Sequence, residues 1–220
     1  MIIPNYAGSI LLRLKQETQE LHHRLEATVD ILNPTLELER YKALLERFYG
    51  FYLPVENRIA ALKGFESLNL DPALRWKTPM LINDLADLEV QTKDLVELPL
   101  CTDLPELSNL AMALGCMYVL EGATLGGQVI SRHLKKMPGL GGTRNLNFYN
   151  SYEDKVGPMW KAFCRALDTY VNAVQADATS LPVDAIIIEA ANQTFQKLDG
   201  WLVGMKISNC GCSLDNNVFS

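Results

Sequence analysis

Two adjacent histidines, His22 and His23, lie in a segment whose apolar spacing predicts an α-helix. Phased at about 100° per residue, the buried stripe of this helix is formed by Leu11, Leu14, Thr18, Leu21 and Leu25. His22 lies at the edge of that stripe, about 80° from Leu14, whereas His23, about 180° away, faces solvent. The phase therefore makes His22 the candidate functional residue, either as a metal ligand or as a hydrogen-bonded residue at an apolar boundary.

Two charged residues flank His22 on the same edge of the predicted helix. A neutral imidazole can bind a metal through one ring nitrogen when the other nitrogen has a hydrogen-bond partner. Glu26, four residues later, can provide that partner directly or through water. Lys15 can contact an anionic group on whatever His22 binds. This edge therefore has the residue types that a metal-containing anionic ligand needs.

Three glycines interrupt a strongly apolar segment, "CMYVLEGATLGGQVISRHLKK" (116–136), which also predicts a helix. We expect Gly122, Gly126 and Gly127 to share one face. Each glycine costs about 1 kcal/mol relative to alanine in a helix interior. Two explanations stay open, close helix–helix packing and close approach of the backbone to a flat ligand; only the second needs an empty slot facing the glycines.

The basic end of this segment also has two explanations. Its cations complement a helix C-terminus, or they form a docking patch for an acidic electron-transfer partner. The residues are Arg132, His133, Lys135 and Lys136.

Helical periodicity dominates the chain, and strand-like alternation is scarce, so the predicted fold class is all-α in a single domain. We expect a domain over 1–208 and a polar tail over 209–220. The predicted helices span 8–29, 38–63, 78–90, 105–136, 153–176 and 182–206.

Composition narrows the class of protein further. The net charge of −6 argues against a nucleic-acid binder. No signal peptide opens the chain, and no uncharged apolar run reaches the roughly 20 residues of a membrane span, so we expect a cytoplasmic protein with no membrane partner. An odd number of cysteines, five, fits free thiols. Cys210 and Cys212 form either a weak two-thiolate metal site or an ordinary tail.

The two motifs together resemble the haem oxygenase family. "LKQETQELHHRLE" is similar to its proximal helix, in which T-x-x-x-H-x-x-x-E supplies the haem-iron ligand, and "YVLEGATLGGQVI" is similar to its glycine-rich distal helix. Similarity to the bacterial, phytochrome-associated branch extends through "RWKTPMLINDLADL" (75–88), "FYNSYEDKVGPMWKAFCRALD" (148–168) and "ANQTFQKLDGWL" (191–202). The resemblance implies an all-α bundle with haem between a proximal and a distal helix.

The resemblance also implies the residues of the site. His22 would be the iron ligand within the Thr18–His22–Glu26 motif, and Gly122 and Gly126, with Gly127 beside them, would lie against the other haem face. Haem propionates would be held by Lys15, Lys161 and Arg165; the last two are four residues apart and can face one pair of carboxylates. Phe195 would be a pocket wall or plain core, and Tyr118 could direct its hydroxyl toward the pocket.

The implied reaction converts haem b, as both cofactor and substrate, with O2 to biliverdin, carbon monoxide and iron. Electrons would come from ferredoxin or a flavoprotein reductase, and a bacteriophytochrome could receive the bilin. One departure is Ala123, where animal enzymes have an aspartate that organises distal water. Backbone groups, water, Thr124 or Gln128 would have to replace it. Alternatives are a haem sensor or carrier without turnover, and a different helical enzyme whose glycines only pack.

Overall fold

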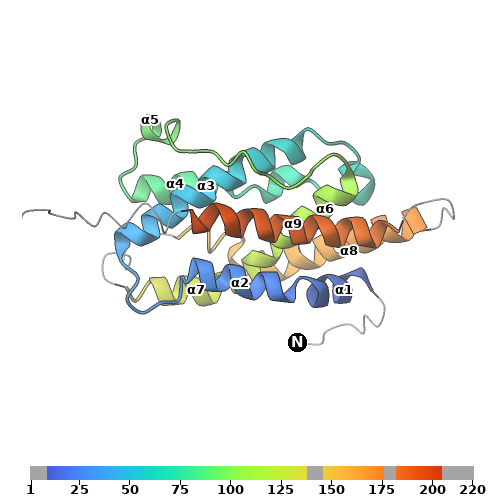
Figure 1. Cartoon of the computed structure of the whole chain (residues 1–220), viewed down its shortest axis with the longest axis horizontal. Helices are drawn as coiled ribbons and strands as arrows, with labels where there is room; N and C mark the ends of the chain where they lie inside the picture. The colour runs from blue at the N-terminus through green and yellow to red at the C-terminus, as the bar shows by residue number, and fades with distance from the viewer. Residues whose placement is uncertain (1–8, 138–145, 176–181, 205–220) are drawn as a thin grey trace, which may run out of the picture.

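The computed structural model describes residues 9–137, 146–175 and 182–204, and within these ranges every regular element is a helix (Figure 1). The α-helices are α1 (Ile10–Glu17), α2 (Gln19–Val29), α3 (Leu38–Ala60), α4 (Thr78–Asp87), α5 (Thr92–Leu95), α6 (Leu110–Gly122), α7 (Gly127–Leu134), α8 (Val156–Gln175) and α9 (Val183–Val203). Short 3₁₀ helices are η1 (Phe65–Leu68), η2 (Pro72–Arg75), η3 (Ala123–Gly126) and η4 (Glu153–Lys155).

The helices pack around α6 and α9, which contact each other along much of their length. Figure 1 shows α3 and α4 on one side of α9 and α1 and α2 on the other, with α6 crossing behind it and continuing into α7. Helix α8 contacts α1, α6 and α9. The two segments that carry the candidate histidine and glycines are thus both attached to this central pair.

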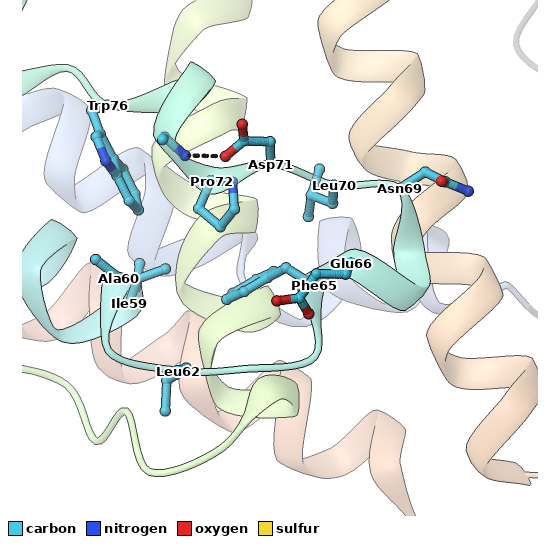
Figure 2. A pocket seen from close by; sticks show the side chains of 11 residues that line it. Ile59, Ala60, Leu62, Phe65, Glu66, Asn69, Leu70, Asp71, Pro72 and Trp76 are labelled. Atoms are coloured by element: carbon cyan, nitrogen blue, oxygen red, sulfur yellow. Dashed lines mark hydrogen bonds between the residues drawn. The ribbon is translucent and has the colours of Figure 1, made fainter.

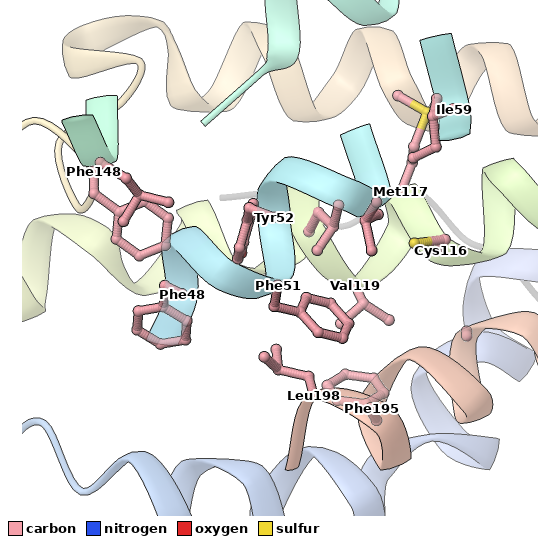
Figure 3. Packing of buried hydrophobic residues seen from close by; sticks show 14 of the residues in the cluster. Phe48, Phe51, Tyr52, Ile59, Cys116, Met117, Val119, Phe148, Phe195 and Leu198 are labelled. Carbon is pink, nitrogen blue, oxygen red and sulfur yellow. The ribbon is translucent and has the colours of Figure 1, made fainter. Parts of the chain in front are cut away.

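Helix α6 is apolar on all sides and is buried almost completely. A helix without a polar face must be covered on every side, and aromatic residues of α3 cover one side of it. Figure 3 shows this part of the core, formed by Phe48, Phe51 and Tyr52 of α3, Met117 and Val119 of α6, and Phe195 and Leu198 of α9. Asn109 starts the helix, because its side chain accepts a hydrogen bond from the Met112 N–H at 3.0 Å.

The first predicted helix is divided in two at Thr18. Its hydroxyl donates to the Leu14 carbonyl at 2.7 Å, and its backbone departs from helical geometry, with φ −108° and ψ −2°. A threonine that bonds the carbonyl four residues earlier bends a helix. The predicted buried stripe is present, since Leu14 and Thr18 are buried and Leu11, Leu21 and Leu25 are half-buried.

Several predicted boundaries differ from the structure. The segment 105–136 starts later, because Asn109 caps it, and is interrupted by η3 at the glycines. The short α5 was not predicted. The tail over 209–220, with its two cysteines, lies outside the described residues.

One helical stretch in the described part of the chain, Leu110–Leu134 (25 residues), is long and apolar enough to cross a membrane by length and composition alone, with a mean hydropathy of 1.3 in an 18-residue window. The fold buries 61% of its most apolar window. Packing in the core therefore covers the larger part of this apolar window.

Gly115 lets α6 and α9 approach within backbone contact, which leads to a stability prediction. A methyl group there would overlap the Ile187 carbonyl oxygen and lie 2.8 Å from Ala190 Cβ. Gly115→Ala should therefore lower the free energy of unfolding by about 1–3 kcal/mol, despite alanine's better helix propensity. The matched control is Gly200→Ala on α9, where a methyl meets nothing within 4 Å; it should raise stability by up to about 1 kcal/mol. Urea denaturation measures both, and equal stabilities would contradict the contact.

Candidate functional site

His22 lies on α2 with its ring accessible from outside the bundle. Its side chain is 53% exposed, and one face of the ring lies against Phe195 of α9, with 5.6 Å between ring centroids. Nε2 lies 3.4 Å from Glu26 Oε1. His23 is exposed as well, and its ring contacts the ring of His22. Of the two histidines, His22 is the one whose ring contacts Phe195 of α9. His22 therefore combines an apolar support, a carboxylate partner and open access.

Helix α2 is fixed to α9 by a buried carboxylate that sequence reasoning missed. Asp199 accepts a hydrogen bond from the Thr28 hydroxyl at 2.6 Å and forms an ion pair with Arg24 at 2.8 Å. Charge-assisted bonds of this kind are about twice as strong as neutral ones. The available signal was an acidic residue at helical spacing among the buried Phe195, Leu198 and Leu202.

Thr18 faces the interior of the bundle. It is buried, its hydroxyl bonds to the Leu14 carbonyl, and it also interacts with the Tyr118 phenol of α6. Burial raises the pKa of Tyr118, and the hydrogen bond with Thr18 opposes that shift. Thr18, which the motif placed among the ligand-binding residues, is thus buried at the point where α1 and α2 divide.

The three glycines do not share one face, which corrects the sequence prediction. A methyl at Gly122 would meet no atom within 4 Å, and one at Gly126 would meet only the end of Ile130 at 3.8 Å. A methyl at Gly127 would overlap the Tyr149 carbonyl oxygen. Gly127 is one residue, about 100°, further round the helix than Gly126, so it packs against the protein. Gly122 and Gly126 border open space, which packing alone does not require.

The side chains after Gly122 leave no carboxylate beside it on the open side. Ala123 is exposed, and the buried Thr124 hydroxyl donates to the Glu121 carbonyl at 2.7 Å. Gln128 donates to the Glu153 carbonyl at 3.3 Å. Thr124 and Gln128, the candidates for replacing an aspartate at 123, are thus both bonded to backbone carbonyls.

The nearest acidic side chain, Glu121, is buried in a polar cluster that was not predicted. Its carboxylate accepts hydrogen bonds from Arg75, from Lys77 Nζ at 3.1 Å and from the Tyr152 hydroxyl at 2.7 Å. Glu121 lies directly before Gly122, so this cluster is attached to the glycine turn.

Three exposed cations lie on helices that contact each other. Lys15 is on α1, and Lys161 and Arg165 are one turn apart on α8. None of them forms an ion pair with a carboxylate in residues 9–137, 146–175 or 182–204. They can therefore bind the carboxylates of a ligand.

Two cavities lie away from His22 and the glycines. One of about 590 Å³ lies where α3, η1 and η2 meet (Figure 2), and one of about 310 Å³ lies beyond the end of α2. Neither is lined by His22, Gly122 or Gly126. The larger one has an apolar floor with Phe65 and Trp76, and its rim carboxylates cap neighbouring backbone N–H groups.

The chain was compared with known proteins. The family model described as heme oxygenase matches residues 9–202. The NO- and CO-bound haem oxygenase of Neisseria meningitidis is similar in structure over 90% of this chain and 92% of that chain, with a TM-score of 0.67 and 22% sequence identity. No curated protein matches. The predicted all-α fold is confirmed.

The contrast between Gly122 and Gly127 gives a second prediction. Gly127→Ala should lower the free energy of unfolding of the ligand-free protein by about 1–3 kcal/mol, because the methyl overlaps backbone. Gly122→Ala, which meets open space, should leave stability unchanged or raise it by up to about 1 kcal/mol. Thermal and urea denaturation measure both. If the Gly127 variant were as stable as the Gly122 variant, the packing of Gly127 against the Tyr149 backbone would be contradicted.

Proposed function

The chain belongs to the haem oxygenase family, and from this premise we propose that it binds haem between α2 and the α6–η3 turn and cleaves it oxidatively. The products would be biliverdin, carbon monoxide and iron, made with O2 and electrons from ferredoxin or a flavoprotein reductase. A cytoplasmic location and transfer of the bilin to a bacteriophytochrome belong to the same proposal, as does membership of the phytochrome-associated branch.

One shared support carries this proposal. Helices α2 and α6 both pack against α9, α6 through Gly115 and α2 through His22, whose ring lies against Phe195. From this support α2 presents an exposed imidazole, and the end of α6 presents the Gly122 backbone, which borders open space. A flat ligand with a central metal fits this pair of walls.

The donor set also suits haem. Among the described residues no group of three His, Cys, Asp or Glu side chains could hold a metal by itself. A single imidazole therefore needs a metal whose other ligands come with it, as in a porphyrin. Exposed cations at Lys15, Lys161 and Arg165 suit its propionates. Bound haem would supply both the iron at which oxygen is activated and the ring that is cleaved.

The proximal residues have separable tasks. His22 binds the metal as neutral imidazole, which requires Glu26 to take the hydrogen of the other ring nitrogen. In the structure Glu26 Oε1 lies 3.4 Å from Nε2; metal binding through Nε2 would therefore need the imidazole and Glu26 to change partners, with Nδ1–H donating to Glu26 directly or through water. Phe195 packs against the ring of His22. Asp199 keeps α2 in place through Arg24 and Thr28.

The distal residues act through their backbone. Because Gly122 and Gly126 carry no side chain, they would let the backbone approach a bound ring closely and limit the space beside it. The exposed Arg132, Lys135 and Lys136 at the end of α7 suit an acidic redox partner.

A second candidate function is a haem sensor or carrier without turnover. Ala123 favours it, because the open side of the turn has no carboxylate there to organise water for proton delivery. A protein whose glycines serve only packing is disfavoured by the open space at Gly122.

Haem binding provides the first test. Haemin titration should give a Soret band, and His22→Ala should shift that band and weaken binding by more than the roughly 10- to 100-fold typical of losing an outer hydrogen-bond partner. The matched control is His23→Ala, which should leave the spectrum almost unchanged. Equal damage from both substitutions would contradict the assignment to His22.

Turnover separates the two candidate functions. With a ferredoxin reductase system and O2, an oxygenase should convert bound haem to a bilin and release carbon monoxide, whereas a carrier should keep its haem spectrum. Chromatography of the product identifies the isomer and hence the carbon at which the ring opens. A stable haem complex under reducing conditions would exclude the oxygenase proposal.

A further inference from the structure

The buried polar cluster at the end of α6 has no task in the function proposed above. It consists of Arg75, Lys77, Glu121 and Tyr152, together with Glu56 of α3. Lys77 and Glu121 are each 2% exposed, and Arg75 and Glu56 are each 6% exposed. Charged residues are rarely buried to this extent without partners, so the arrangement of the cluster calls for a specific explanation.

Glu121 is the centre of the cluster. Arg75 and Lys77 donate to different oxygens of its carboxylate, and Tyr152 donates to the oxygen that Lys77 also contacts. Lys77 Nζ further donates to the Arg75 carbonyl and to the Tyr152 hydroxyl, both at 2.7 Å. Arg75 also reaches the Met159 carbonyl on α8. The end of α6 is thereby bonded to η2, to the segment before η4 and to α8.

The cluster balances two cations against two carboxylates. Glu56 completes this balance by accepting the Lys77 backbone N–H at 2.6 Å. Burial lowers the pKa of Lys77, and the charge of Glu121 opposes that shift. Removing one member of such a set leaves an uncompensated buried charge, which is strongly destabilising. Each member therefore constrains the others.

The backbone of Glu121 belongs to the glycine turn. Its carbonyl accepts the Thr124 hydroxyl at 2.7 Å and the Ala123 N–H, and the next residue is Gly122. The helix changes from α to 3₁₀ geometry directly after Gly122. The side chain of Glu121 thus connects three buried segments to the turn whose backbone borders open space.

We propose that Glu121 is a positioning residue: its carboxylate, held in the buried cluster, fixes the end of α6 so that the Gly122 backbone borders the ligand space at a constant depth. The consequence for bound haem rests on the function proposed above. The consequence for the turn itself does not, and can be measured without haem.

The first experiment follows hydrogen exchange of residues 118–127 in the haem-free protein. Two variants are used: Glu121→Gln, and the double variant Glu121→Met/Lys77→Met, which keeps the cluster neutral and so keeps the protein folded if the first variant fails. Both should speed exchange in this segment by at least about tenfold through local opening. The matched control for general destabilisation is Leu85→Ala, which creates a cavity in the core where α4 packs against α3. Unchanged exchange in the Glu121 variants, or an equal increase in the control, would overturn the proposal.

The second experiment measures the C–O stretching frequency of the carbon monoxide complex of the reduced, haem-loaded proteins. The Glu121 variants should shift or broaden the band, because the Gly122 wall no longer has one position, and Leu85→Ala should leave it in place. Increased exchange together with an unmoved band would show that the cluster holds the turn but does not set the ligand space, and the proposal would be overturned in that part.

The two experiments distinguish failure of the inference from failure of the proposed function. If the wild-type protein gives no Soret band with haemin, the proposed function is wrong, and hydrogen exchange still decides whether Glu121 fixes the turn. If haem binds and the Glu121 variants behave like the wild type in both measurements, the proposed function stands and the positioning role is wrong.

Discussion

The contact between the backbones of α6 and α9 at Gly115 sets the geometry of the whole site. Helix α6 has no polar face and must be covered on every side; at Gly115, α9 covers it so closely that a methyl group would overlap the Ile187 carbonyl oxygen. Helix α6 continues into the Gly122 turn, and α9 carries both Phe195, beneath His22, and Asp199, which holds α2. The imidazole and the helix that leads to the glycine turn are therefore both positioned by packing on α9.

The two walls of the site are built on opposite principles. The wall on α2 presents a side chain on an exposed helix, anchored by Asp199 and bent at Thr18, so its imidazole can turn and exchange partners. The wall on α6 consists of backbone, so its position is defined only as well as the position of the segment to which it belongs. Proteins hold such segments by bonding them from several directions, which is what the cluster around Glu121 does. In the proposed function, a ligand residue on an exposed helix would thus work with a backbone wall that is held in place.

Sequence patterns predicted the features that depend on the helical repeat of a single segment. The buried stripe of the first helix, the boundary position of His22 and the all-α class follow from a period of about 3.6 residues, and the structure agrees. The division at Thr18 depends on one side-chain bond, and the error at Gly127 came from grouping residues that a turn of about 100° separates. Asp199 and Glu121 were missed for a different reason. Their partners lie far away in the sequence, and no local pattern shows that a buried carboxylate will meet them.

The position of Glu121 also changes the meaning of Ala123. The chain does carry a carboxylate at this turn, but two residues before Ala123 and directed into the protein, where Arg75, Lys77 and Tyr152 bind it. The open side is left with Gly122, Ala123 and Gly126, which offer only backbone groups and a methyl. Within this turn, polarity at a ligand would come from backbone groups or from water ordered by them. Such groups cannot adjust as a flexible side chain can, so their effect depends on where the turn is held. The carboxylate of this turn, Glu121, therefore lies behind the ligand space, and its proposed effect is to position the turn without contacting the ligand.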